Sequence, residues 1–222
     1  MSKLILVSDF DGTITAHDFD ALAAESGFFT DVQTPWDEHR AGRLSHFDAM
    51  RITFAQIRVP EHELAALTDK AHPEPTLAAC ISNLRDAGWR VVVVSAGCSW
   101  YIERILDKAG VSIGPDGDLE LHTNPGEYNP TFGLKLMAPV DSPFHSPETG
   151  VDKAAIVRFH QQNGATVAYA GDGHTDIPAA LCVPPHLRFA RGQLMQSLQE
   201  RGETARPFTR WAEVAEGLLA KT

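Results

Sequence analysis

Two aspartates follow a short apolar run near the start of the chain. In the stretch LILVSDFDGTIT, Asp9 and Asp11 are separated only by Phe10. Because alternate residues of an extended strand point to the same face, the two carboxylates are expected to lie side by side and to resist ionisation. A divalent cation would relieve their repulsion, and Mg²⁺ suits carboxylate and carbonyl oxygens. The spacing therefore indicates a metal site at the end of a buried strand.

Other polar groups follow the later strand-like runs or begin a helix. They comprise a hydroxyl, backbone N–H groups, an amine and two further carboxylates, at Ser95, Ala96, Gly97, Lys153, Asp172 and Asp176. The carboxyl ends of parallel strands meet at one edge of a sheet, where ligands bind. Acids, a hydroxyl, a lysine and a metal that converge at this edge predict a phosphate site.

The elements that would position these groups alternate between strands and helices. The strands are expected at 4–7, 90–94, 165–170 and 187–190, and the helices at 76–87, 100–109 and 151–162. This alternation predicts an α/β fold, a Rossmann-like and mostly parallel sheet flanked by helices. Two further strands are expected at 119–122 and 131–137, before a proline-rich loop at 138–150 without regular structure.

Residues 17–75 interrupt this alternation with a run of helical patterns. Within it, Ser45 and Asp48 resemble a capping box that begins a helix. The predicted organisation is a core of residues 1–16 and 76–222, with a small helical lid of residues 17–75 inserted after the first strand.

Composition excludes several classes of function. The chain has 222 residues, of which 43% are hydrophobic and 22% charged, as in ordinary globular proteins. Its formal net charge of −10 argues against nucleic acid or an anionic membrane as a partner. The three cysteines are widely spaced and form no disulfide framework, and we find no signal peptide or membrane-spanning stretch. A cytoplasmic protein is therefore expected.

The ordered motifs DFDGT, SAG, a later lysine and GDGHTD resemble those of the haloacid dehalogenase-like superfamily. The resemblance covers essentially the whole chain, and the helical insertion corresponds to the C1 cap of that family. It implies that Asp9 is a nucleophile that forms an aspartyl-phosphate. It also implies that Asp11 is the general acid for the departing alkoxide and then the base that activates water.

The resemblance further implies how metal and phosphate are held. Mg²⁺ would bind the Asp9 carboxylate, the Asp11 backbone carbonyl and the Asp172 carboxylate, while Asp176 would orient Lys153 or a metal-bound water. The phosphoryl oxygens would be held by Thr13, Ser95, the N–H of Ala96 or Gly97, and Lys153. The partner would be a small phosphorylated metabolite, and the protein a monomer or homodimer.

Within the superfamily, the helical cap resembles the phosphoserine phosphatase-like group. That group acts on phosphoserine, phosphocholine, phosphoethanolamine and the enol-phosphate of methionine salvage. The continuation of the first motif to Asp18 and the segment Ile177 to Leu194 resemble the salvage phosphatases, although the proline-rich 138–150 replaces their cysteine-rich stretch. Asp18 and Arg51 are the expected specificity residues.

Several alternatives stay open at this point. A phosphosugar mutase of the same fold also keeps both aspartates and a C1 cap. A receiver domain would need no lid and about half this length, and a non-catalytic binding protein would not need an intact acid pair. His174 either faces the site or lies in a turn without chemistry.

Overall fold

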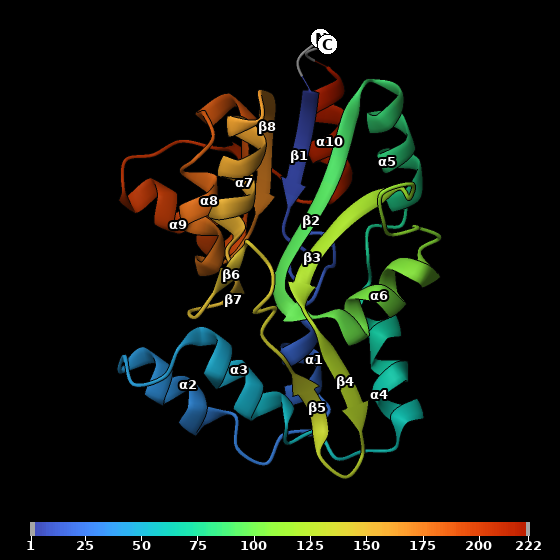
Figure 1. The fold of residues 1–222 in the computed structure, drawn as a ribbon, viewed down its shortest axis with the longest axis vertical. Coiled ribbons are helices and arrows are strands. Elements are labelled where there is room, and N and C mark those ends of the chain that lie inside the picture. Colours follow the sequence, from blue (N-terminus) through green and yellow to red (C-terminus); the bar gives the residue numbers. More distant parts are fainter. Residues whose placement is uncertain (1–2, 221–222) are drawn as a thin grey trace.

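The computed structural model describes residues 3–220 and is built around a parallel sheet (Figure 1). The strand order is β10-β9-β8-β1-β2-β3, and each neighbouring pair is parallel. The strands are β1 (Lys3–Ser8), β2 (Trp89–Cys98), β3 (Leu119–Asn124), β8 (Ala165–Gly171), β9 (Arg188–Ala190) and β10 (Arg206–Pro207). The predicted α/β fold with a mostly parallel sheet is confirmed.

Alternate residues of the central strands enter two separate hydrophobic cores. In β1, Ile5 and Val7 pack into one core and Leu6 into the other, as the two-residue period of a strand requires. One face of the sheet is covered by α5 (Leu77–Asp86), α6 (Ser99–Lys108) and α10 (Trp211–Leu219). The opposite face is covered by α7 (Lys153–Gln162), α8 (Ile177–Ala180) and α9 (Gly192–Glu200), with the short 3₁₀ turns η2 (His174–Asp176) and η3 (Pro185–Leu187) nearby.

A block of helices lies beyond the carboxyl end of the sheet (Figure 1). It consists of α1 (Phe19–Glu25), α2 (Gln33–Arg40), α3 (His46–Phe54), α4 (Glu61–Leu67) and the 3₁₀ turn η1 (Thr68–Ala71), and we call it the lid. The predicted cap on α3 is present, because the Ser45 hydroxyl accepts a 3.0 Å hydrogen bond from the Asp48 N–H. The lid therefore stands over the edge where the strands end.

Two chain segments join the lid to the core, and they run beside each other. Thr15 and Pro73 form an antiparallel bridge, and the Ala16 N–H donates to the carbonyls of Ala71 and His72. The Glu74 N–H then donates to the Ile14 carbonyl at 2.9 Å. The entry to the lid and the exit from it are thus tied together.

An antiparallel hairpin of β4 (Gly126–Asn129) and β5 (Gly133–Leu136) packs beside α3, outside the main sheet. The strand expected at 131–137 therefore belongs to this hairpin. A two-residue ladder of β6 (His145–Ser146) and β7 (Gly150–Val151) lies in the loop expected to be irregular. No helix within residues 3–220 has the length and apolar character needed to span a bilayer.

Candidate active site

A buried lysine joins two of the predicted carboxylates at the carboxyl edge of the sheet. The Lys153 Nζ atom lies 2.7 Å from Asp9 Oδ1 and 2.6 Å from Asp176 Oδ1. The exposed fractions of Asp9, Lys153 and Asp176 are 6%, 4% and 0%. Asp9 follows β1, Lys153 begins α7 and Asp176 follows β8, so three separate segments meet here.

Asp176 has hydrogen-bond donors on both carboxylate oxygens. Besides Lys153, the Tyr169 hydroxyl donates to Oδ1 at 2.5 Å, and the N–H groups of Asp172 and Gly173 donate to Oδ2 at 3.1 and 2.8 Å. Burial alone would raise the pKa of Asp176, but the Lys153 charge and these donors outweigh it and lower the pKa. Asp176 is thus an ionised group that orients Lys153.

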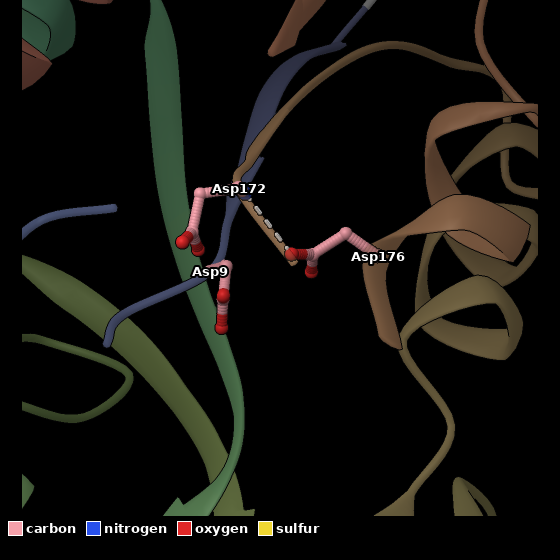
Figure 2. Close-up of side chains that lie close together, drawn as sticks. All are labelled: Asp9, Asp172 and Asp176. Atoms are coloured by element: carbon pink, nitrogen blue, oxygen red, sulfur yellow. Dashed lines mark hydrogen bonds between the residues drawn. The ribbon is translucent and has the colours of Figure 1, made fainter. Parts of the chain in front are cut away.

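Oxygen atoms of Asp9, Asp172 and Asp176 lie within 4.8 Å of one another (Figure 2). Three carboxylates and one ammonium leave two negative charges uncompensated. Burial, followed by the charge of Asp176, raises the pKa of Asp9 and raises that of Asp172 to about 6. A hard dication fits this donor set, because it would compensate the excess charge with oxygen ligands.

The environment of each carboxylate separates possible metal ligands from supporting groups. Asp172 Oδ1 accepts from the Thr13 hydroxyl at 3.0 Å, and Asp9 Oδ1 contacts Lys153. Within residues 3–220, the second oxygen of each of these two carboxylates accepts no hydrogen bond. Asp9 and Asp172 therefore fit a metal better than Asp176, whose oxygens are already used.

Asp11 lies in a different environment from Asp9. Its Oδ2 accepts from the Tyr101 hydroxyl at 2.6 Å and from the Ser95 hydroxyl at 3.4 Å, and its Oδ1 accepts from the Phe19 N–H at 3.3 Å. Burial raises the pKa of Asp11 to about 7, although the Tyr101 hydrogen bond opposes the increase.

The expectation that Asp9 and Asp11 repel each other is not met. Each of them is repelled by other carboxylates instead. The acids that raise the pKa of Asp9 are Asp176 and Asp172, and those that raise the pKa of Asp11 are Asp18 and Asp20. The strand β1 ends at Ser8, so the two-residue alternation does not extend through the aspartates.

The SAG segment lies within β2, which continues through it to Cys98. The Ser95 hydroxyl, which is 1% exposed, accepts a 2.9 Å hydrogen bond from the Gly97 N–H. Asn124, at the end of β3, donates to the carbonyls of Ala96 at 2.7 Å and Thr149 at 3.0 Å. The side chain of Asn124 thereby joins this segment to the turn that precedes Lys153.

The two expected specificity residues lie apart from each other. Asp18 lines a cavity of about 500 Å³ together with Gly12, Asp172 and Arg191. Arg51 is half exposed and forms a 3.0 Å ion pair with Asp48, and it lines neither this cavity nor the one described next.

A second cavity of about 410 Å³ lies between the lid and the core. Its lining includes His39 and His46 from the lid, and Lys153, Arg158 and His174 from the core. Burial lowers the pKa of the His46 imidazole to about 4. The cavity places lid side chains opposite the lysine that contacts Asp9.

Four residues that support the site were not singled out from the sequence. They are Tyr101, Asn124, Tyr169 and Arg191. The Arg191 guanidinium donates to the carbonyls of Gly12, Thr15 and Thr209 at 2.5, 2.8 and 2.6 Å, and so holds the turn after Asp11. Two signals were available: Tyr169 is an aromatic residue in the otherwise small and aliphatic run 165–170, and Arg191 lies in the segment Ile177 to Leu194 that resembles the salvage phosphatases.

Residues 6–181 match the family model described as haloacid dehalogenase-like hydrolase. A phosphoserine phosphatase of Halobacterium salinarum is 28% identical over 179 residues, which cover 78% of this chain and 80% of that protein. A 2-hydroxy-3-keto-5-methylthiopentenyl-1-phosphate phosphatase of Microcystis aeruginosa is 27% identical over 226 residues, which cover 100% of both chains.

Solved structures show the same fold at lower identity. A substrate-bound phosphoserine phosphatase superposes with a TM-score of 0.64 and 19% identity, covering 97% of this chain and 98% of that one. The phosphoserine phosphatase of T. onnurineus superposes with a TM-score of 0.62 and 16% identity, covering 97% and 94%. At these identities the likeness establishes the fold alone.

Proposed function

The chain belongs to the haloacid dehalogenase-like hydrolase family, and we propose that it is a Mg²⁺-dependent phosphatase of small phosphomonoesters that acts through an aspartyl-phosphate on Asp9. The observation that carries this proposal is the buried Lys153 ammonium between Asp9 and Asp176, with Asp172 beside them. This arrangement holds a nucleophilic carboxylate and a fixed positive charge at one point, as phosphoryl transfer requires.

In the proposed reaction, an Asp9 oxygen attacks phosphorus and the bond to the leaving oxygen breaks. Asp11 donates its proton to the departing alkoxide, so the alcohol leaves neutral. Asp11 then takes a proton from water, which attacks the aspartyl-phosphate, releases inorganic phosphate and restores the Asp9 carboxylate. Lys153 stays charged throughout because Asp176 and Asp9 both stabilise its ammonium.

Asp9, Asp172 and the backbone carbonyl of Asp11 would hold the Mg²⁺. When bound, the cation supplies charge neutralisation that lets an anionic nucleophile approach an anionic phosphate. Thr13, Ser95, the N–H of Ala96 or Gly97, and Lys153 would bind the phosphoryl oxygens. Chelation should therefore abolish activity and added Mg²⁺ should restore it; full activity after exhaustive chelation would contradict the metal requirement.

The substrate we propose is a small metabolite whose alcohol part enters the cavity between lid and core. The cavity volume of about 410 Å³ supports a ligand of this size. Phosphoserine and 2-hydroxy-3-keto-5-methylthiopentenyl-1-phosphate are the two candidates, because relatives named for them align over most or all of the chain. Comparing kcat/KM for both, with phosphocholine as a third substrate, selects between them.

We also propose that the enzyme acts in the cytoplasm. Cys80, Cys98 and Cys182 are all free thiols, as is usual in a reducing compartment.

The central test replaces Asp9 by asparagine, which keeps the shape of the side chain but not its nucleophilicity. With p-nitrophenyl phosphate and Mg²⁺, we expect Asp9→Asn to lower kcat by at least about 10³-fold. Acid quenching during turnover should trap a phosphorylated protein in the wild type and not in the variant, as detected by intact mass.

Asp86→Asn is the matched control, because Asp86 is an exposed aspartate at the end of α5. It should retain wild-type activity. Full activity in Asp9→Asn, with an unchanged circular dichroism spectrum, would remove the covalent mechanism.

A further inference from the structure

The hydroxyl of Tyr101 contacts the carboxylate of Asp11 across a long sequence separation. Tyr101 lies in the first turn of α6 and is 2% exposed. Its hydroxyl donates to Asp11 Oδ2 at 2.6 Å, while the Ser95 hydroxyl lies 3.4 Å from the same oxygen. Asp11 is therefore held next to the hydroxyl of Ser95, which we assign to the phosphoryl site.

A second donor holds the other oxygen of the same carboxylate. The N–H of Phe19, the first residue of α1 in the lid, lies 3.3 Å from Asp11 Oδ1. The rings of Phe19 and Tyr101 are stacked, with centroids 4.0 Å apart and planes inclined by 5°. One aromatic pair thus brings both donors to Asp11, one from the core and one from the lid.

The backbone at Gly97 lies close to this contact and leaves no room for a side chain at that position. A Cβ atom added at Gly97 would lie 1.9 Å from the Tyr101 hydroxyl and 2.8 Å from Asp11 Oδ2. Any side chain at position 97 would collide with the hydrogen bond. The glycine of the SAG segment is thus required by the Tyr101–Asp11 pair, independently of any role in binding phosphate.

We propose that Tyr101 is a positioning residue for proton transfer: its hydroxyl, together with the Phe19 N–H, fixes the Asp11 carboxyl at the leaving-group side of the phosphoryl site. This inference rests on the proposed phosphatase function. Of the Tyr101 side chain, the ring contributes to packing and the hydroxyl contacts the acid. Tyr101→Phe separates the two, because it keeps the stacked ring.

The test uses two substrates with different needs for an acid. An alkyl phosphate such as phosphoserine must have its leaving oxygen protonated, whereas p-nitrophenolate departs readily without a proton. The ratio of their kcat/KM values reports the step that breaks this bond. We expect Tyr101→Phe to lower kcat/KM for the alkyl phosphate by about tenfold or more and that for p-nitrophenyl phosphate by less than about twofold.

Two further variants make the outcome specific. Tyr128→Phe removes a hydroxyl that bonds Val59 instead of Asp11, so the ratio should stay at the wild-type value. Asp11→Asn should shift the ratio further than Tyr101→Phe, and adding Tyr101→Phe to Asp11→Asn should cause no additional shift, because both act through one carboxyl.

The possible results separate the role of Tyr101 from the proposed phosphatase function. Equal losses on both substrates, no loss on either, or an additional shift in the double variant would overturn the role of Tyr101. A wild-type protein that hydrolyses neither substrate with Mg²⁺ would instead refute the proposed function. Thermal unfolding of each variant checks that the fold is retained.

Discussion

At the scale of single residues, the site is defined by a surplus of negative charge around one lysine. Lys153 satisfies Asp9 and Asp176, but Asp172 has only the Thr13 hydroxyl as a donor within residues 3–220. Burial, followed by the charge of Asp176, raises the pKa of Asp172, so a proton would compete with the proposed cation for this carboxylate. Metal binding should consequently depend on pH in a range above that of an ordinary aspartate.

Competition between a proton and Mg²⁺ for Asp172 should make the effect of Mg²⁺ on stability depend on pH. Without Mg²⁺, the pKa of Asp172 is about 6 in the folded chain, against an ordinary value of 3.8, so its contribution to stability falls as the pH rises between these values. At the proposed site, Mg²⁺ would bind the ionised form and would reverse that loss of stability. The increase in Tm on adding Mg²⁺ should therefore be larger at about pH 7.5 than at about pH 5.

Differential scanning fluorimetry at the two pH values measures this increase. Asp172→Asn should show little increase at either pH. An Mg²⁺ effect of equal size at both pH values in the wild type would contradict the assignment of Asp172 as a ligand.

The residues of the site differ in how far the sequence could predict them. Asp9, Asp172, Asp176 and Lys153 follow strands or begin a helix, so their convergence follows from the topology of a parallel sheet. Tyr101 and Asp11 are 90 positions apart in sequence, and their contact depends on how α6 packs. No short sequence motif marks a contact of this kind, so it can be identified only once the packing of the helices is known.

At the scale of elements, the two segments between lid and core form the connection on which the site depends. Glu74, in the returning segment, is buried, and its carboxylate accepts from the hydroxyl and N–H of Thr76 and from the N–H of Ala212 in the first turn of α10. Burial would raise the pKa of Glu74, but these hydrogen bonds and Arg210 lower it overall. Glu74 thus ties the lid connection to a core helix.

Replacing this carboxylate should weaken the connection. Glu74→Gln keeps the shape of the side chain but puts an NH₂ group where one oxygen accepts hydrogen bonds, so we expect a loss of about 1–3 kcal/mol in the free energy of unfolding. Because the folded pKa is lowered, the wild-type advantage should be present above about pH 4.5 and disappear as the pH falls through the folded value. Urea unfolding at several pH values measures both effects.

The control residue lies on α10, the helix that Glu74 contacts. Glu216 is exposed in α10, and Glu216→Gln should leave the free energy of unfolding nearly unchanged. A loss in Glu74→Gln no larger than in the control would show that Glu74 does not support α10.

Elements with a clear pattern of apolar residues could be predicted from the sequence. The positions of elements that depend on contacts between distant segments could not. The central strands and the helices between them have continuous apolar runs and glycine ends, and they lie where expected. Of the hairpin, only β5 was expected, as a strand at 131–137, whereas β4 was not expected. The position of the hairpin outside the sheet depends on packing against α3. Strand β2 continues beyond Val94 because Ser95 and Cys98 pair with the end of β3.

At the scale of the whole molecule, the lid lies across a cavity from the core residues of the proposed site. Asp9, Ser95 and Lys153 are almost completely buried, and Lys153 lines the cavity between the lid and the core. Besides the packing of α3 against β5, Glu148 joins α3 to the core: its side chain accepts from the His46 N–H at 3.2 Å and its carbonyl accepts from the Phe47 N–H at 2.8 Å. We infer that these contacts break and re-form during turnover.

A reversible crosslink tests this requirement directly. In the double variant His46→Cys and Glu148→Cys, oxidation should join α3 to the core and lower kcat by at least about tenfold, because product release and substrate entry both need the lid to open. Reduction should restore the activity. Each single variant should be insensitive to oxidation, which controls for the native cysteines. If the oxidised double variant, with the crosslink verified by mass spectrometry, turned over at the reduced rate, opening along α3 would be excluded and the substrate would have to enter from another side.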